Sequence, residues 1–337
     1  MGKICSSSLL RAPLVILACV ATATHAQQTP GELPGNYPSK PIRMLVGNAP
    51  GGGIDLTARA VAQKLTERWG RSVVVDNRAG ASGVIAMDLT AQATPDGYTL
   101  LVTAGSLIGT ATAQKKLRYD VRTAYAPITQ LTSLYYLLLV TPSLPVNSVK
   151  DLIAYAKSRP GTLNYGSSGV GGAGHLAAEL FSSMAGVRMV NVPYKGGGLV
   201  LADMISGHIQ LGFTSTISGM PHVRSGKLKA LAVTSPQRAK ALPDLPTLSE
   251  AGVPGFDLIN WYGLFAPAGT PRAIVAVLHR DVTQALNSSD VQAMFAKDGA
   301  EAAPSDSPEE FKGLLAKDLD MWEKIIRTMS SFADSLR

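Results

Sequence analysis

Three glycine-rich segments carry the residues of this 337-residue chain whose types and spacing could hold a ligand. They are residues 50–55, 166–175 and 194–198, and each lies between a predicted strand and a predicted helix. The start of a helix presents unpaired backbone N–H groups and the positive end of the helix dipole, and glycine lets an anion approach that backbone closely. In open α/β sheets, ligands bind beyond the carboxyl ends of the strands. The three segments together therefore predict one cleft that holds a negatively charged ligand.

Polar residues within these segments favour binding over a purely structural role. A glycine at a strand–helix turn often only permits a tight turn, and for any one segment that interpretation is the stronger. The second segment also carries Ser167, Ser168 and His175, however, and the third carries Lys195. Asp55 lies in a first helical turn, where a carboxylate usually caps free N–H groups. Because its charge would repel an anion, we expect Asp55 to cap the helix or to contact the ligand through water.

Enzyme motifs are incomplete in this sequence. Residues 169–174 match the dinucleotide pattern Gly-x-Gly-x-x-Gly, but no acidic residue follows about 20 positions later, where the ribose needs it. Ser168 lacks the closing glycine of a nucleophile elbow, because Val170 stands there. The four histidines after residue 26 lack metal-ligand spacing. We therefore expect no catalysis, cofactor or metal; an exported serine hydrolase using Ser168 or Ser106 with His175 stays as the alternative.

The first 26 residues have the pattern of a secretory signal. Lys3 and Arg11 precede an apolar stretch over residues 12–21, and small residues precede the predicted mature start at Gln27. The stretch is shorter than the ~20 residues that a membrane-spanning helix needs. Cys19 leaves lipoprotein processing as an alternative. Both cysteines lie in this segment, so we expect no disulfide or thiolate site in the mature chain.

Composition and charge limit the remaining classes. The chain is 46% hydrophobic and 16% charged, as in globular proteins, and its length suits two domains. The formal charge of +7 falls to +5 without the signal segment, with 29 basic against 24 acidic side chains. Because the basic residues are scattered and form no runs, we expect no nucleic-acid partner. A mildly basic exported protein instead suits small anions.

Hydrophobic periodicity alternates between strands and helices along most of the chain. Strands are predicted at residues 42–46, 73–75, 98–102, 137–140, 163–165, 189–192, 209–213, 228–233 and 259–266, and helices at 55–69, 83–93, 148–158, 173–185, 199–206 and from 307 onward. This alternation predicts an α/β fold with mostly parallel sheets flanked by helices. We expect two lobes, with residues 27–129 and 251–337 forming the first lobe and residues 130–250 inserted as the second.

Eight collinear segments of the sequence resemble the periplasmic solute receptors of tripartite tricarboxylate transporters, the Bug family. The segments are residues 48–55, 77–80, 95–101, 165–171, 192–198, 229–234, 245–247 and 261–271. Together they extend over essentially the whole mature chain. The resemblance implies a two-lobed, type II-like periplasmic binding protein, without catalysis or cofactor. It also implies a monomer that closes on a carboxylate-bearing solute and delivers it to a small and a large membrane subunit.

The resemblance also implies which residues form the site. The first segment would hold a ligand carboxylate, partly through ordered water, and loops of both lobes would complete the pocket. The expected ligand-binding residues are Pro50, Gly51, Gly52, Gly53, Asp55, Ser106, Ser167, Ser168, Gly171, His175, Tyr194, Lys195, Gly196 and Thr214. Thr214 departs from many relatives, which have an acidic residue after the strand at 209–213. Such an acid could pair with a ligand amine, so its absence favours plain mono-, di- or tricarboxylates over amino acids. Use of the receptor for signalling to a sensor domain is a further alternative.

Overall fold

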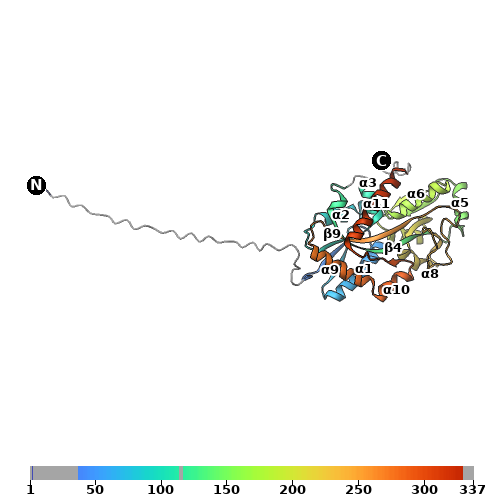
Figure 1. Ribbon diagram of the computed structural model, residues 1–337. Coiled ribbons are helices and arrows are strands. Elements are labelled where there is room, and N and C mark those ends of the chain that lie inside the picture. Colours follow the sequence, from blue (N-terminus) through green and yellow to red (C-terminus); the bar gives the residue numbers. More distant parts are fainter. Residues whose placement is uncertain (1, 3–36, 114–116, 329–337) are drawn as a thin grey trace.

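The computed structural model describes residues 37–113 and 117–328 together with Gly2, and these form an α/β molecule built on one extended, curled sheet (Figure 1). Except for Gly2, the predicted signal segment lies outside the described residues. Among the helices that the structure describes, none combines the length and apolar character needed to cross a membrane.

The elements follow the predicted alternation, with additions in the middle and towards the end of the chain. The strands are β1 Ile42–Val46, β2 Val73–Asn77, β3 Thr99–Ala104, β4 Tyr125–Val140, β5 Asn164–Ser167, β6 Val190–Pro193, β7 Leu211–Ser215, β8 Lys229–Val233, β9 Ile259–Pro267 and β10 Glu301–Ala302. The helices are α1 Gly53–Trp69, α2 Val84–Ala91, α3 Gly105–Ala113, α4 Val121–Ala124, α5 Val149–Ser158, α6 Ala173–Ala185, α7 Gly197–Ile205, α8 Thr216–Arg224, α9 Arg272–Leu286, α10 Ser289–Lys297 and α11 Pro308–Thr328, with a 3₁₀ turn η1 at Ala81–Gly83.

The strand order β2-β1-β3-β9-β4-β7-β5-β6 places one set of parallel strands at each end of the sheet. Strands β1, β2 and β3 are parallel to one another, and so are β5, β6 and β7. The expectation of mostly parallel sheets is wrong for the centre, where β4 is antiparallel to β7, β8, β9 and β10 and β9 is antiparallel to β3. The chain enters the second lobe along β4 and returns to the first along β9, so these neighbouring strands run in opposite directions.

Strand β4 joins the two lobes without a break. Its register with β9 extends to Tyr135, paired with Ile259, and its register with β7 begins at Tyr136, paired with Ser215. The first lobe, as used below, contains β1–β3, β9, β10 and the first part of β4. The second lobe contains β5–β8 and the last part of β4. The boundary predicted at residues 129/130 falls inside β4, and the exact division into domains stays a prediction.

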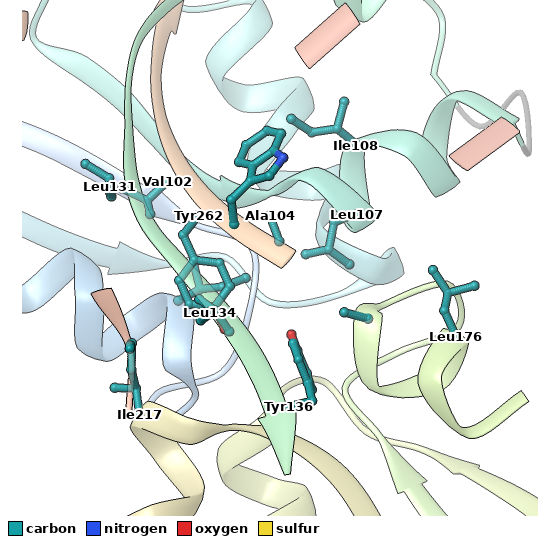
Figure 2. Packing of buried hydrophobic residues seen from close by; sticks show 14 of the residues in the cluster. Val102, Ala104, Leu107, Ile108, Leu131, Leu134, Tyr136, Leu176, Ile217 and Tyr262 are labelled. Atoms are coloured by element: carbon teal, nitrogen blue, oxygen red, sulfur yellow. The ribbon is translucent and has the colours of Figure 1, made fainter. Parts of the chain in front are cut away.

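Helices cover both faces of the sheet, and the apolar core continues through the hinge. In Figure 1, α2, α3, α6 and α11 lie on one side of the strands, while α1, α8, α9 and α10 lie on the other; α11 packs on α3, and α1 packs on α8 and α9. Figure 2 shows Val102 of β3, Leu131 and Leu134 of β4, Leu176 of α6 and Ile217 of α8 within one buried cluster. This continuous core holds the strand ends, and the helix starts that follow them, at the junction of the lobes.

Candidate functional site

Asp55 fixes the loop before α1 and leaves the first backbone N–H groups of this helix without a side-chain cap. Gly51 has a left-handed φ of +83°, and Gly52 caps the helix without any side-chain hydrogen bond. Instead of capping the helix, the buried Asp55 carboxylate accepts hydrogen bonds from the Gly51 N–H, from Arg59 Nε and from Asn77 Nδ2, each at 2.9 Å. The first N–H groups of α1 therefore keep neither a side-chain cap nor an intrahelical partner.

The same contacts keep Asp55 ionised. Burial alone would raise the pKa of the Asp55 carboxyl, but the hydrogen bonds from Arg59, Gly51 and Asn77 together lower it below the ordinary value. The Arg59 guanidinium also lies 2.9 Å from the second carboxylate oxygen. The negative charge is thus balanced by Arg59, and Asp55 is not among the residues that line the ligand cavity described below.

The start of α6 repeats this backbone arrangement with a different side chain. Gly171 also has a φ of +83°, and Gly172 caps the helix without a side-chain bond. The buried His175 accepts a hydrogen bond from the Gly171 N–H at its Nδ1 atom, 3.2 Å away, and its ring stacks near Tyr165. Burial lowers the pKa of His175, against an opposing influence of Glu179. His175 is therefore neutral near pH 7 and fixes the second glycine loop as Asp55 fixes the first.

A cavity lies where the starts of α1, α7 and α8 converge on the hinge strands. Its volume is about 30 Å³. A single water needs at least ~10–15 Å³ by this measure, so the cavity admits a group of a few atoms, about the size of a carboxylate. None of its lining residues carries a charge; they are Asn48, Gly52, Gly53, Ile54, Tyr136, Ser168, Gly197, Val200, Phe213, Thr214, Ser215, Ser218 and Tyr262.

Neutral hydroxyl groups form the inner wall of this cavity. Ser215 Oγ and Ser218 Oγ lie 2.9 Å apart, and Asn260 Nδ2 donates to Tyr136 Oη at 3.4 Å. Burial raises the pKa of both Tyr136 and Tyr262, so both phenols stay protonated and can donate hydrogen bonds.

Two buried polar atoms at the cavity have no hydrogen-bond partner in the described part of the chain. They are Thr214 Oγ1 and Asn48 Oδ1, on side chains whose residues are 3% and 5% exposed. Buried polar groups are normally satisfied, because an unpaired one costs about 1–3 kcal/mol. A bound polar molecule or water is therefore needed to complete these two groups.

The structure places four of the predicted site residues at the cavity: Gly52, Gly53, Ser168 and Thr214. Tyr194 and Lys195 line a second hollow of about 230 Å³, and Ser168 borders both spaces. The Tyr194 hydroxyl donates to Asp203 Oδ2 at 2.6 Å, which fixes the loop before α7.

The remaining predicted residues lie around these spaces without lining them. Pro50 and Gly51 are exposed on the first loop, and Gly196 caps α7. Ser106 is buried and accepts from Asn260, and the buried Ser167 Oγ has no partner among the described residues. Gly171 and His175 hold each other, as Gly51 and Asp55 do.

Sequence reasoning missed several lining residues. Tyr262 belongs to the segment 261–271 that carries the resemblance but was not among the expected site residues; it lines the cavity, whereas Trp261 bonds to Asp318 of α11. Gly197 belongs to the predicted glycine segment 194–198, whereas Ser215 had no signal beyond its position next to the predicted Thr214. Asn48 belongs to the segment 48–55 that carries the resemblance, whereas Tyr136 carried no signal of its own, because only the pairing of β4 with β7 brings it to the cavity.

Direct contacts join the two lobes across the mouth of the site. The Ala49 N–H donates to the Lys195 carbonyl at 2.8 Å. Farther along, Ser82 Oγ donates to the Val170 carbonyl at 2.9 Å. The glycine loops of the two lobes therefore touch each other, and the structure describes the closed arrangement.

Two α/β lobes joined by paired hinge strands, with a small polar cavity between them, define a periplasmic binding protein. The model of the family described as "Tripartite tricarboxylate transporter family receptor" matches residues 57–330. The chain belongs to this receptor family. The family consists of solute-binding receptors rather than enzymes, so the prediction of a non-enzyme is confirmed and the hydrolase alternative falls away.

Relatives and solved structures agree with this family. Protein BugT of Bordetella pertussis is 34% identical over 322 residues, covering 95% of this chain and 98% of the relative. A structure described as R. palustris Rpa4515 with adipate is 37% identical with a TM-score of 0.81, covering 87% of this chain and 98% of that one. MatC from Rhodopseudomonas palustris with bound malate is 31% identical with a TM-score of 0.81, covering 86% and 100%. The predicted resemblance and the two-lobed fold are confirmed.

Proposed function

We propose that this protein is a periplasmic receptor that binds a small carboxylate-bearing solute between its lobes and delivers it to a tripartite membrane transporter. One observation carries the proposal: three helix starts, from both lobes, converge on a carboxylate-sized cavity without any charged lining residue. Backbone N–H groups and helix dipoles at such starts favour an anion. The carboxylate ligands named for two related structures, adipate and malate, support the same ligand class.

In this proposal the two spaces divide the ligand between them. Gly52 and Gly53 of α1 bind one carboxylate through backbone N–H groups, and Thr214 and Ser168 contribute hydroxyl donors. The rest of the solute extends past Ser168 into the hollow at Tyr194 and Lys195, where the lysine supplies positive charge. No acidic side chain lines either space, so a ligand ammonium group would find no counter-ion. The proposal therefore favours plain carboxylates over amino acids.

A binding panel tests the ligand class. Adipate, malate, succinate and citrate are compared with the matched neutral compound adipamide and with aspartate and glutamate, by thermal shift and by intrinsic tryptophan fluorescence. A carboxylate at a thousandfold excess over its Kd stabilises the protein by ~4 kcal/mol. We expect a shift with at least one plain carboxylate and none with adipamide. No shift with any carboxylate, or an equal shift with adipamide, would contradict the proposal.

Export and transport need separate tests. If residues 1–26 direct export, cell fractionation recovers the protein in the periplasm and N-terminal sequencing starts at Gln27. Recovery of a lipid-modified protein beginning at Cys19 would instead support lipoprotein processing. A transport role predicts that the ligand-bound receptor captures a small and a large membrane subunit, whereas capture of a sensor protein would support signalling.

A further inference from the structure

The lobes touch along two short stretches of main chain, residues 49–52 of the first lobe and residues 195–198 of the second, named here the closure seam. Within it, the Ala49 N–H donates to the Lys195 carbonyl. A Cβ added at Gly196 would lie 2.8 Å from the Ala49 nitrogen, and one added at Gly52 would lie 3.3 Å from the Gly197 nitrogen. The seam thus consists largely of backbone atoms in van der Waals contact, which only residues without a bulky side chain permit.

Gly198 is the position where a side chain would most directly obstruct this contact. A Cβ atom there would lie 2.4 Å from the Pro50 carbonyl oxygen, 3.1 Å from the Gly51 carbonyl carbon and 3.3 Å from the Gly51 Cα. All three atoms belong to the backbone of the opposite lobe. Gly198 lies in the first turn of α7 with an ordinary φ, so alanine suits its own helix and even favours it. The obstruction therefore exists only when the lobes are closed.

Ser82 forms the second point of contact beyond the seam. Its hydroxyl donates to the Val170 carbonyl, and it sits in the turn η1 with a φ of +55°. A non-glycine residue in this left-handed region is uncommon and stores some strain. The turn aims the hydroxyl at the opposite lobe, where it makes a bond that separated lobes cannot make.

We propose that Gly198 and Ser82 are positioning residues for ligand retention, because they set how completely the two lobes close. The role in ligand retention rests on the proposed function. The contact between the lobes does not depend on that function. When only the closed form holds the ligand, the apparent Kd rises in proportion as the closed population falls. A Cβ at position 198 lowers that population by obstruction, and loss of the Ser82 hydroxyl lowers it by removing one bond. Gly198 lines neither the cavity nor the second hollow, whereas Ser82 borders the second hollow, so Gly198→Ala is the variant that tests closure apart from ligand contacts.

Hydrogen exchange measures the seam without any ligand. The Ala49 N–H is bonded only across the lobes, so its exchange rate reports closure directly. We expect Gly198→Ala to speed exchange of Ala49 relative to wild type, and Gly313→Ala to leave it unchanged. Gly313 is the matched control, since it lies in α11 and an added Cβ meets nothing within 4 Å. Equal Ala49 exchange in wild type and Gly198→Ala, or no protection in wild type with or without adipate, would overturn the proposal.

Adipate binding supplies the functional measurement. We expect Gly198→Ala to weaken adipate binding roughly tenfold, mainly through faster dissociation. Overpacking of this kind changes an equilibrium constant by roughly a few-fold to a hundredfold. Ser82→Ala should speed dissociation about three- to tenfold, as for one lost hydrogen bond. Unliganded melting temperatures should stay at or above wild type for Gly198→Ala, which excludes misfolding. Unchanged dissociation in both variants would contradict the retention role, whereas a wild type that binds no carboxylate would contradict only the proposed function.

Discussion

The starts of α1 and α6 show how two lobes build the same backbone shape around one charged and one neutral acceptor. In each, a glycine at φ +83° precedes a glycine cap, and the fourth residue after the first glycine holds that glycine's N–H. In the first lobe this residue is Asp55, ionised and paired with Arg59. In the second it is His175, neutral and stacked near Tyr165.

This difference teaches that the loop shape requires an acceptor at that position but not a charge. Both side chains are withdrawn from their own helix, which leaves the first-turn N–H groups uncapped. The two acceptors should respond differently to mutation, pH and salt, however. Asp55 is a charged acceptor paired with Arg59, whereas His175 accepts as a neutral ring. Three measurements separate the two loops.

Removing the Asp55 carboxylate should have the largest effect. Asp55→Ala removes the acceptor of the Gly51 N–H and one of the two acceptors of the Asn77 amide, which keeps the Asn48 carbonyl, while the half-exposed Arg59 can be resolvated. We expect the free energy of unfolding to fall by about 2 kcal/mol, because a hydrogen bond to a charged acceptor contributes ~1.5–3 kcal/mol. Urea denaturation measures it. Asp55→Asn, which keeps one acceptor oxygen, should lose less, and a loss under about 0.5 kcal/mol for Asp55→Ala would show that the loop does not depend on this residue.

Acid should weaken the second loop before the first. Burial lowers the pKa of His175 below its ordinary 6.5. As the pH falls through 6.5, the unfolded state therefore binds more protons than the folded state. The free energy of unfolding declines from there toward the folded pKa. The pKa of Asp55 is also lowered, from an ordinary 3.8, so its contribution is complete above that value and declines only below it.

Urea denaturation from pH 8 to pH 5 isolates the His175 contribution. His222 also has a pKa lowered by burial, so the comparison is between wild type and His175→Gln, which both retain His222. We expect wild type to lose about 1 kcal/mol more than the variant over this range. Parallel curves for the two proteins would mean that His175 does not titrate on unfolding.

Salt should have the smallest effect, and only through the first loop. The Arg59 side chain is 49% exposed, so its attraction to Asp55 is screened by added salt. Between low salt and 0.5 M sodium chloride, wild type should lose roughly 0.5 kcal/mol more than Arg59→Gln. His175→Gln should keep the full wild-type salt response, because its loop contains no ion pair. An Arg59→Gln protein with the same salt response as wild type would refute the charged character of the first loop.

Local signals predicted many of the element boundaries well. The helix predicted at residues 173–185 coincides with α6, and Ser148, where the helix 148–158 was predicted to begin, caps α5 by accepting from the Asp151 N–H. These features depend on neighbours in the sequence, such as a glycine before the helix or a hydroxyl three residues upstream of an N–H.

Elements that depend on distant packing were missed. The first part of β4 has register irregularities between Pro127 and Thr129 and between Gln130 and Thr132, which destroy the period of two that marks a strand. Helix α8 contains Gly219 and Pro221, both poor helix formers, yet Gly219 lies tightly against Leu137 and Leu139 of β4. Packing, rather than propensity, determines both elements.

The site shows the same division. Each of the three glycine segments follows a strand end by a short turn, and residues of all three, Gly52, Ser168 and Gly197 among them, line the cavity. The direction in which Asp55 and His175 point was not accessible, since it depends on Arg59, Asn77 and Tyr165 in three dimensions. Sequence therefore located the loops, whereas the separation of loop-holding from cavity-lining residues required the fold.

The uninterrupted course of β4 governs how this molecule can open. Because its ladder passes directly from β9 to β7 between Tyr135 and Tyr136, the lobes cannot swing on loose tethers. Rotation must be absorbed as added torsion along β4 and β9, and the irregularities on either side, including that at Leu138 and Leu139, are where such torsion concentrates. Bending of this kind breaks few backbone hydrogen bonds and adds little conformational entropy. The lobes therefore return to the same alignment after each opening and closing.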